Sequence, residues 1–470
     1  MLYRIFFLLV LGLCQQGLAQ PFTYFPMNFP SVGIGGSGSV HDFTVDHLGR
    51  KYIYGAIYHE ARPGNSFYAM IRLNSDYTID TTFKIQGPRD IYHVNTFQNY
   101  FVVQTLNRLI KVDQNGADIQ PNYFSNMHSN HPALEFFIST YSPAYGDGRI
   151  LVSSDFPVFS ADSSELYFLH RILPDGRRDS TFNVSTDNGV IRAEMMSDSS
   201  VYVSGIFTTY NGIYRPSFVK VDTSGIMDTS FNVNVTFGRV FPLYKYPNGK
   251  LLVRGDFFIG GHPKPLVFAR LNTDGSLDSS FKILDWDSLT NTWIITVLPL
   301  ADGGFLCGGR IDSYDGYPAK NILKIDSLGN IDTTAFPSGT GVTHNQTTPF
   351  VSSIRRISAS QYLVMGQFNT FNGIYSPAMV MLQQNPVSIQ TTENNSFTAH
   401  PYPNPSNGIF SIDANIEVKL GGVYNQQGQH VYLFKSNSID LRHLPNGLYF
   451  YKIFNSKGQV ARGKLLKIEN

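Results

Sequence analysis

The sequence has few charged residues and no excess of either sign. Charged side chains make up 15% of the 470 residues, against about 25% in a typical soluble protein. The 36 basic and 35 acidic side chains nearly cancel, so no overall basic field is present to attract nucleic acid. No run beyond the N-terminus reaches 18 apolar residues, and we therefore expect no transmembrane segment.

Cysteine is almost absent, and one of the two copies lies in a predicted signal peptide. The N-terminus has the pattern of a secretory signal, with a positive charge at Arg4, an apolar run at 5–13 and the small residues Gly17 and Ala19 at the cleavage site. Cleavage after Ala19 removes Cys14, so the mature chain retains Cys307 alone and no internal disulfide is expected. Cys307 occupies a position where other copies of a repeated strand carry valine, which predicts a buried core thiol and not a nucleophile.

What the chain does contain is typical of β structure. Aromatic residues make up 14% of the sequence, which also holds 41 Gly and 25 Pro. This mixture favours many short strands joined by tight turns and excludes a helical bundle or a disordered chain. We therefore predict an all-β fold.

A repeated phrase runs through the middle of the chain. It consists of a basic and an apolar residue, a turn, then Asp, Ser or Thr, and Phe. Copies lie at 72–83, 171–182, 220–231 and 270–281, with a longer copy at 324–336 and a degenerate one at 111–124. The Asp is expected to accept a hydrogen bond from the backbone two residues on, and the Phe to anchor the chain in the core. Tyr77 replaces the turn glycine of the first copy, which predicts a different turn there.

A second phrase, exemplified by NGKLLVRGDF at 248–257, gives one strand per repeat. Its units end at Ile57, Leu106, Phe156, Phe207, Phe257, Ile311 and Phe368, in steps of about 52 residues. Leu251, Val253 and Phe257 share one strand face with Gly255, whose missing side chain permits close approach of a neighbouring backbone.

One such unit cannot bury both faces of its small sheet, so the copies must pack against one another. We predict a seven-bladed β-propeller over residues 20–386, with a β-solenoid as the alternative. The last unit lacks its closing phrase, and a segment within 22–29 is expected to supply the missing strand. The phrase resembles the delta-60 repeat of bacterial secreted proteins, a resemblance that implies a propeller and no agreed activity.

The C-terminal part differs in character. A polar linker at 387–400 precedes residues 401–470, where turn pairs separate alternating strands and predict a small β-sandwich. This tail resembles the type A C-terminal sorting domain of the type IX secretion system of Bacteroidetes. The resemblance rests on Pro403, Asn404, Pro405, Gly408, Gly428, Gly447, Tyr449, Lys464 and Lys467. It implies that residues 401–470 meet the secretion machinery, and that the protein is exported to the periplasm and then released or held on the cell surface.

Catalytic and metal motifs are weak. His128 and His131, with Glu135, have ligand-like spacing, but Pro132 interrupts any continuous helical face, and solvated loop histidines are the simpler interpretation. The repeated Asp residues lack the full oxygen set of a calcium loop. Asp312 and Asp315 form a possible carboxylate pair of the kind a glycosidase needs. No cofactor is expected.

Two tryptophans give the best binding candidate. Trp286 and Trp293, with Asp285 and Asp287, would suit stacking on a sugar and bonding to its hydroxyls, whereas burial between blades is the simpler interpretation. The leading hypothesis is a monomeric, non-catalytic binding scaffold for an extracellular glycan or protein. The rival is a glycan hydrolase or lyase with its site at the central mouth. A purely structural surface component is a third possibility.

Overall fold

A computed structural model provides the structure. It describes residues 22–26, 39–58, 67–86, 91–105, 109–120, 123, 127–128, 136–138, 147–160, 166–196, 200–285, 292–345, 347–385, 397–413, 415–426, 430–456 and 460–468. The chain divides into two compact units, Met1–Asn385 and Pro386–Asn470. Every regular element of the described residues is a strand, which confirms the all-β prediction. The described part contains no helix long and apolar enough to cross a membrane.

The first unit is a succession of small antiparallel sheets, each built mainly from strands that are neighbours in the sequence. The first three are β2(Ser39–Val45)–β3(Lys51–Tyr58)–β4(Phe67–Leu73)–β5(Ile79–Gln86), β6(His93–Thr96)–β7(Tyr100–Gln104)–β8(Leu109–Asp113)–β9(Asp118–Gln120), and β10(Met127–His128) and β11(Phe136–Ile138) on β12(Ile150–Ser160) with β13(Leu166–Ile172). The next three are β14(Val190–Met195)–β15(Val201–Gly205)–β18(Phe218–Val221), β19(Val235–Lys245)–β20(Leu251–Ile259)–β21(Leu266–Leu271)–β22(Leu284–Asp285), and β23(Trp293–Pro299)–β24(Phe305–Arg310)–β27(Ile322–Ile325).

The last sheet of the unit combines both ends of the repeat region. Its order is β1(Phe22–Pro26)–β33(Met379–Gln384)–β30(Gln361–Gln367)–β29(Phe350–Arg356). Short strands form three further small sheets: β16(Thr209–Tyr210) with β17(Ile213–Tyr214), β25(Ser313–Tyr314) with β26(Tyr317–Pro318), and β31(Thr370–Phe371) with β32(Ile374–Tyr375) and β28(Val342–Thr343).

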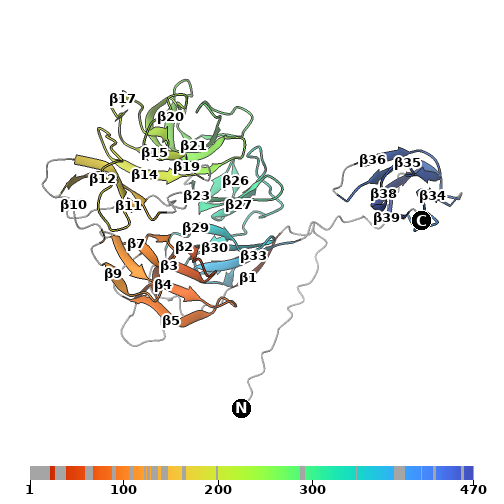
Figure 1. Ribbon diagram of the computed structural model, residues 1–470, viewed down its shortest axis with the longest axis horizontal. Helices are drawn as coiled ribbons and strands as arrows, with labels where there is room; N and C mark the ends of the chain where they lie inside the picture. Colours follow the sequence, from red (N-terminus) through yellow and green to blue (C-terminus); the bar gives the residue numbers. More distant parts are fainter. Residues whose placement is uncertain are drawn as a thin grey trace, which may run out of the picture. The chain divides into compact units, whose positions relative to one another are not determined.

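Consecutive sheets share their hydrophobic cores. A cluster of buried apolar side chains lies between each sheet and the next. A further cluster, with Val40 and Ile53 on one side and Leu363 and Met365 on the other, joins the first sheet to the last. Figure 1 shows the sheets around a common centre, with β14, β19, β23 and β29 close to it. Each sheet thus buries both faces against its neighbours, as the repeat pattern requires.

The N-terminal strand completes the last sheet. β1 pairs antiparallel with β33, from Phe22 opposite Gln384 to Pro26 opposite Val380. Phe22 is buried and stacks on Phe336 with ring centroids 5.5 Å apart. The prediction that an N-terminal segment supplies the missing strand is confirmed.

The repeated phrase is a hydrogen-bonded unit. In the copy at 270–281, Arg270 Nε donates to Asp278 Oδ2 at 2.6 Å, and Asp278 Oδ1 accepts the Ser280 N–H at 3.0 Å. Asp179 and Asp228 accept the corresponding backbone N–H two residues on. The predicted Asp turns are therefore confirmed. Phe182, Phe231 and Phe281 are all buried, as expected of anchors.

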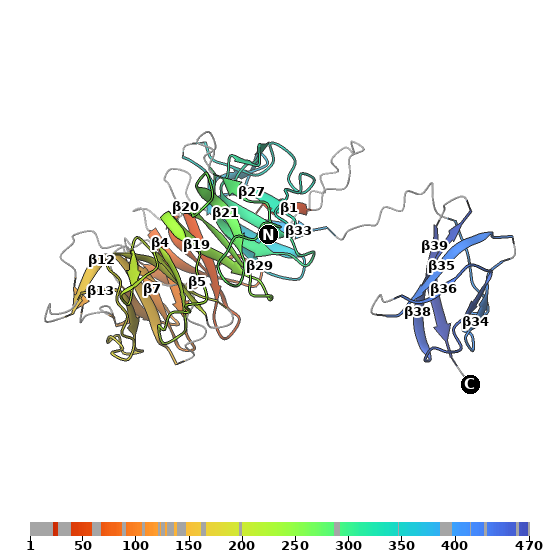
Figure 2. The same cartoon turned by 90° about the horizontal axis from the view of Figure 1, so that it is seen from above.

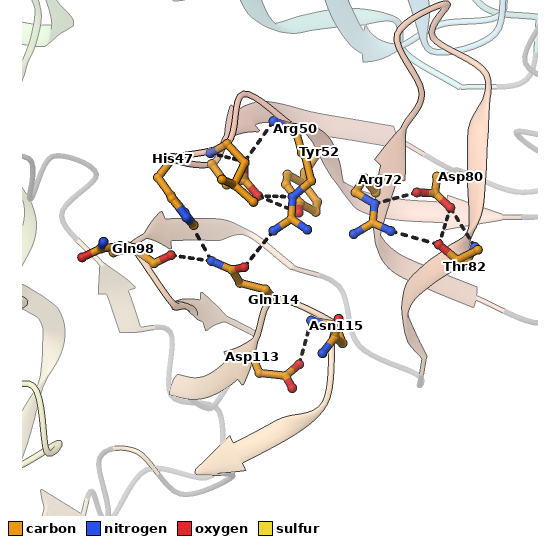
Figure 3. A network of polar contacts seen from close by, with 12 residues as sticks. His47, Arg50, Tyr52, Arg72, Asp80, Thr82, Gln98, Asp113, Gln114 and Asn115 are labelled. Atoms are coloured by element: carbon orange, nitrogen blue, oxygen red, sulfur yellow. Dashed lines mark hydrogen bonds and ion pairs between the residues drawn. The ribbon is translucent and has the colours of Figure 1, made fainter.

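The basic residue of the phrase also links neighbouring sheets. Arg171 Nη1 donates to the Thr223 carbonyl at 2.7 Å, and Arg270 Nη1 donates to the Ser327 carbonyl at 2.7 Å, each in the turn of the following sheet. Figure 3 shows the same Arg, Asp and Thr arrangement in the first copy, where Arg72 Nε donates to Asp80 at 2.7 Å. One short phrase thus shapes its own turn and ties it to the next sheet.

The prediction of a different turn at Tyr77 is wrong. Tyr77 adopts φ 67°, close to the φ 88° of Gly176 at the same place in a later copy. Both close the same turn, since Tyr77 N donates to Asn74 O and Gly176 N donates to Leu173 O. The tyrosine ring lies under the Lys51 ammonium, 4.2 Å from the ring centroid, and packs against the neighbouring core cluster. These contacts offset the cost of the left-handed conformation.

The glycine of the second phrase is needed for close packing of backbones. A Cβ placed on Gly255 would lie 1.9 Å from the Arg239 carbonyl oxygen, and one on Gly366 would lie 2.1 Å from that of Phe350. Both contacts are far shorter than van der Waals distance, so a side chain would push the first two strands of the sheet apart. This confirms the prediction that the glycine of that phrase permits close approach of a neighbouring backbone.

The second unit has a core of its own. A four-stranded sheet, β36(His430–Phe434)–β35(Val418–Tyr424)–β38(Gly447–Asn455)–β39(Val460–Lys467), packs on the pair β34(Ile409–Ser411)–β37(Ser438–Asp440). Phe410 and Ile439 of the pair meet Val423 and Ile453 of the larger sheet in one buried cluster. Figure 2 shows β34 beside the larger sheet.

Candidate functional site

The predicted sorting residues of the second unit come together at the end of β39. The side chain of Asn404 forms two hydrogen bonds with the backbone of this strand: its Nδ2 donates to Lys464 O at 2.7 Å, and its Oδ1 accepts the Leu466 N–H at 2.8 Å. Ser406 continues the contact by donating its N–H to Leu466 O at 3.0 Å and accepting that of Ile468 at 2.8 Å. The turn at 403–408 is therefore fixed to the last strand by both side chain and backbone.

Lys467 joins this arrangement to the segment around Arg442 and Leu444. Its side chain is buried, and Nζ donates to the carbonyls of Leu444 at 2.6 Å and Arg442 at 3.1 Å. Gly408 lies against it at φ 118°, and a Cβ there would lie 3.0 Å from both Arg442 N and Lys467 Cε. A buried ammonium that bonds two carbonyls joins three segments of the tail.

The other sorting residues lie around the same end of the sheet. Tyr449 is buried and donates its hydroxyl to Pro445 O at 2.7 Å, while Gly447 at φ 157° stands opposite Lys467 in the register. Pro403 and Pro405 follow cis peptide bonds and are exposed, as is Lys464. Gly428 lies outside the described residues.

A second cluster of polar groups lies on β2, β6, β14, β20 and β29 of the first unit. Asp42 of β2 accepts hydrogen bonds from Arg355 Nε of β29 at 2.8 Å, from Arg355 Nη2, and from Ser353 Oγ at 2.6 Å. Burial raises the pKa of Asp42, but the charge and hydrogen bonds of Arg355 outweigh it and hold that pKa below its usual value. Asp42 is thus an ionised carboxylate with occupied oxygens.

Two further groups extend this cluster. Arg192 Nε on β14 pairs with Glu194 Oε1 at 2.7 Å. His93 on β6 is 9% exposed, and its pKa is lowered to about 4, mainly by burial. The charge of Asp42 raises this pKa, whereas the charges of Arg192 and Arg355 lower it. His93 is therefore neutral near pH 7. We call Asp42, His93, Arg192, Glu194, Arg254 and Arg355 the central cluster.

Arg254 on β20 is the member without a carboxylate in contact. Its guanidinium carbon lies 5.4 Å from the ring centroid of Phe241 and 5.5 Å from that of Trp293. Its Nε and Nη1 are enclosed and find no hydrogen-bond acceptor in the described part of the chain. Burial, followed by the charge of Arg192, lowers the pKa of Arg254 to about 9.

The predicted sugar-binding residues are only partly described. Trp286 and Asp287 lie outside the described residues. Trp293 begins β23 with 37% of its surface exposed. Asp285 lies on β22 of the preceding sheet, with its Oδ1 3.6 Å from His262 Nε2. The structure thus places Trp293 beside the central cluster and Asp285 on the last strand of another sheet.

The remaining candidates are described only in part. His131 and Glu135 lie outside the described residues, as does the side chain of His128. Asp315 pairs with Lys282 at 2.9 Å, and Cys307 is fully buried, which confirms its prediction as a core thiol. Among the described residues no group of three or more His, Cys, Asp or Glu side chains is placed to hold a metal ion.

Sequence reasoning missed the central cluster. Its members come from five sheets and share no motif in the sequence. One signal was available: Arg254 stands where the matching strands carry Ser204, Met365 or Gly308. A lone charge at a position that is otherwise small or apolar marks a place where one repeat departs from the common packing.

Two family matches agree with this geometry. Residues 400–467 match the secretion system C-terminal sorting domain, and residues 197–231 and 247–281 match a β-propeller domain of unknown function. The tail is therefore a type IX sorting domain, and the protein is exported to the cell surface or secreted. The comparison with curated proteins gives no match.

Solved structures with similarity to this chain include several β-rich proteins. PorZ, a surface component of the type IX secretion system of Porphyromonas gingivalis, is 11% identical with a TM-score of 0.27, covering 92% of this chain and 75% of its own. A protein of unknown function from Dyadobacter fermentans is 12% identical with a TM-score of 0.35, covering 78% and 100%. The N-terminal domain of Nup159 is 10% identical with a TM-score of 0.40, covering 77% and 95%.

Proposed function

We propose that this protein is a secreted or cell-surface scaffold that binds a ligand outside the cell and catalyses no reaction on it. The proposed organisation is a signal peptide at 1–19, a seven-bladed propeller of delta-60 repeats at 20–386, a linker at 387–400 and a sorting sandwich at 401–470. The mature protein is a monomer of a Bacteroidetes cell envelope. The succession of sheets with shared cores supports the ring.

The observation that carries the non-catalytic role is the state of the central carboxylates. A glycosidase needs a carboxylic acid with a raised pKa beside an ionised partner. Asp42 instead has a lowered pKa and donates nothing, since Arg355 and Ser353 occupy its oxygens. Glu194 is held by Arg192 at 2.7 Å. These two carboxylates serve as partners for arginines, which suits a binding surface better than acid and base catalysis.

The test uses the protein as it leaves the cell. Secreted protein is screened on glycan and protein arrays, and every bound glycan is then assayed for release of reducing ends or unsaturated products. We expect binding without product. Product release that survives purification to homogeneity would establish the rival hydrolase or lyase.

The proposed organisation has its own tests. Peptide mapping of the secreted protein should begin at Gln20 and end within 387–400. Two-dimensional class averages of the particle viewed along its axis should show seven sectors. Six or eight sectors would contradict the blade count without affecting the binding role.

A further inference from the structure

The central cluster contains more positive charge than its carboxylates balance. Arg355 is matched by Asp42 and Arg192 by Glu194, at hydrogen-bond distance in both cases. Arg254 has no such partner among the described residues, and His93 is neutral. The cluster therefore carries one net positive charge that remains to be compensated.

The same region has a surplus of enclosed polar atoms without partners. Arg254 Nε and Nη1 and Asn95 Nδ2, all donors, find no acceptor, and neither does the ring nitrogen Nε2 of His93. Asn95 and His93 are 5% and 9% exposed, so bulk water does not freely solvate them. Unsatisfied buried donors cost about 1–3 kcal/mol each. Asp256 Oδ1 on the same strand as Arg254 is likewise enclosed and without a partner among the described residues, and its other oxygen lies 3.5 Å from Arg239, so the acceptor that is missing is one that reaches Arg254.

Trp293 indicates what kind of molecule would bring that oxygen. The centroid of its indole lies 5.5 Å from the Arg254 guanidinium carbon, and the residue is still 37% exposed, so a flat apolar surface adjoins the unbalanced charge. Ligand sites commonly combine an aromatic wall with a few polar groups that fix orientation. A guanidinium fork fits a carboxylate, and a pyranose ring fits an indole face.

We propose that the central cluster binds an acidic sugar residue, with its carboxylate on Arg254 and its ring against Trp293. This inference rests on the proposed binding role and specifies its ligand class. Asp42 holds Arg355 in position, and Glu194 holds Arg192. The negative charge of these carboxylates repels an anionic ligand from the two arginines that they pair with. Binding at Arg254 supplies the missing negative charge, so the ligand must be anionic.

The experiment measures calorimetric binding of three probes to the secreted protein: an oligogalacturonate, the neutral oligogalactose of equal length, and inorganic phosphate. We expect the oligogalacturonate to bind at least tenfold more tightly than either of the others. Arg254→Met keeps an unbranched side chain between the two rings and should weaken oligogalacturonate binding by tenfold or more. Trp293→Leu should weaken it by a smaller factor.

Arg177→Met is the matched control, because it removes one positive charge from an exposed ion pair with Asp175. It should bind as the unmodified protein does. Equal binding of phosphate, or undiminished binding by a folded Arg254→Met protein, would overturn the acidic-sugar site. A neutral glycan or protein that binds equally well to the Arg254→Met protein would overturn this inference and leave the proposed scaffold role intact. Circular dichroism melts of each variant establish beforehand whether it is folded.

Discussion

Asp42 and Arg355 form an ion pair between the first strand of the first sheet and the first strand of the last, with Arg355 Nε 2.8 Å from Asp42 Oδ1. The two residues are 313 positions apart in the sequence. Together with the apolar cluster around Val40 and Met365, the pair joins the beginning of the repeat region to its end. A fold that depends on such a junction should be sensitive to single changes on either side of it.

Removing the arginine of this junction should destabilise the whole ring. Arg355→Leu leaves the Asp42 carboxylate without its main partner in a largely enclosed position. Because the arginine itself is partly exposed, we expect a loss of about 1–2 kcal/mol and not the larger value for a fully buried pair. Thermal melts followed by circular dichroism measure it. Arg177→Leu, which breaks an exposed ion pair, should leave the melting temperature unchanged. An equal fall in the melting temperature of the two variants would show that Arg355 stabilises the protein only through its contribution to the net charge.

The N-terminal strand offers a matched pair of phenylalanines. Phe22 is 4% exposed and packs on Phe336, whereas Phe25 on the same strand is 53% exposed. Phe22→Ala should cost about 3 kcal/mol, because a buried ring is lost, and Phe25→Ala should cost less than about 0.5 kcal/mol. Urea unfolding of the two variants gives the comparison. If both behave like the unmodified protein, β1 does not close the ring in solution.

The fold was largely predictable because the repeated residues perform repeated tasks. Asp179 and Asp278 shape their turns through the same bonds, and Gly255 and Gly366 meet carbonyl oxygens at the same point of their sheets. Periodicity in the sequence reports such shared constraints directly. Tyr77 escaped prediction because its strained backbone is stabilised by Lys51 and a core formed with the last sheet, which local turn rules do not include.

The two candidate sites also differ in how far the sequence predicts them. The sorting domain was predictable from its motif, although the meeting of the motif residues around Lys467 depends on pairing between 403–408 and β39 that no short motif reveals. The central cluster as a whole was not predictable, since its members come from five sheets and share no motif, and only Arg254 departs visibly from the repeat pattern. Only the arrangement of the sheets around a centre brings His93 near Asp42 and Arg192, and Arg192 near Arg254.

Acid should weaken the links between sheets. Burial raises the pKa of Asp179, but hydrogen bonds from Thr181 and Arg171 outweigh it and lower that pKa to about 2, from an ordinary value of 3.8. A depressed folded-state pKa contributes stability that is present above pH 3.8 and is lost as the pH falls toward 2. The difference corresponds to about 2 kcal/mol. Melting temperatures between pH 6 and pH 2.5 should show the loss.

The control for this pH effect is Asp179→Asn. The amide cannot titrate, so the variant should be less stable near neutral pH and lose less of its stability on acidification. Asp228, whose pKa is also lowered to about 2 by Lys220 and Ser230, should behave in the same way. A variant whose acid response equals that of the unmodified protein would show that the carboxylate is not responsible.

Two lysines near the C-terminus separate the fold of the sorting domain from its surface. Lys467 is 2% exposed and bonds the carbonyls of Arg442 and Leu444, whereas Lys464 is exposed on the same strand. Lys467→Ala leaves both carbonyls without this donor and loosens the turn at 403–408, so we expect the protein to accumulate in the periplasm and its tail to be cleaved faster by added protease. Lys464→Ala should keep the protease resistance of the tail. Immunoblots of periplasm, cell surface and medium measure the distribution of each full-length variant. If Lys464→Ala retains the fold and still blocks export, the exposed amine itself contacts the secretion machinery; if Lys467→Ala is exported normally, the buried contact is not required for recognition.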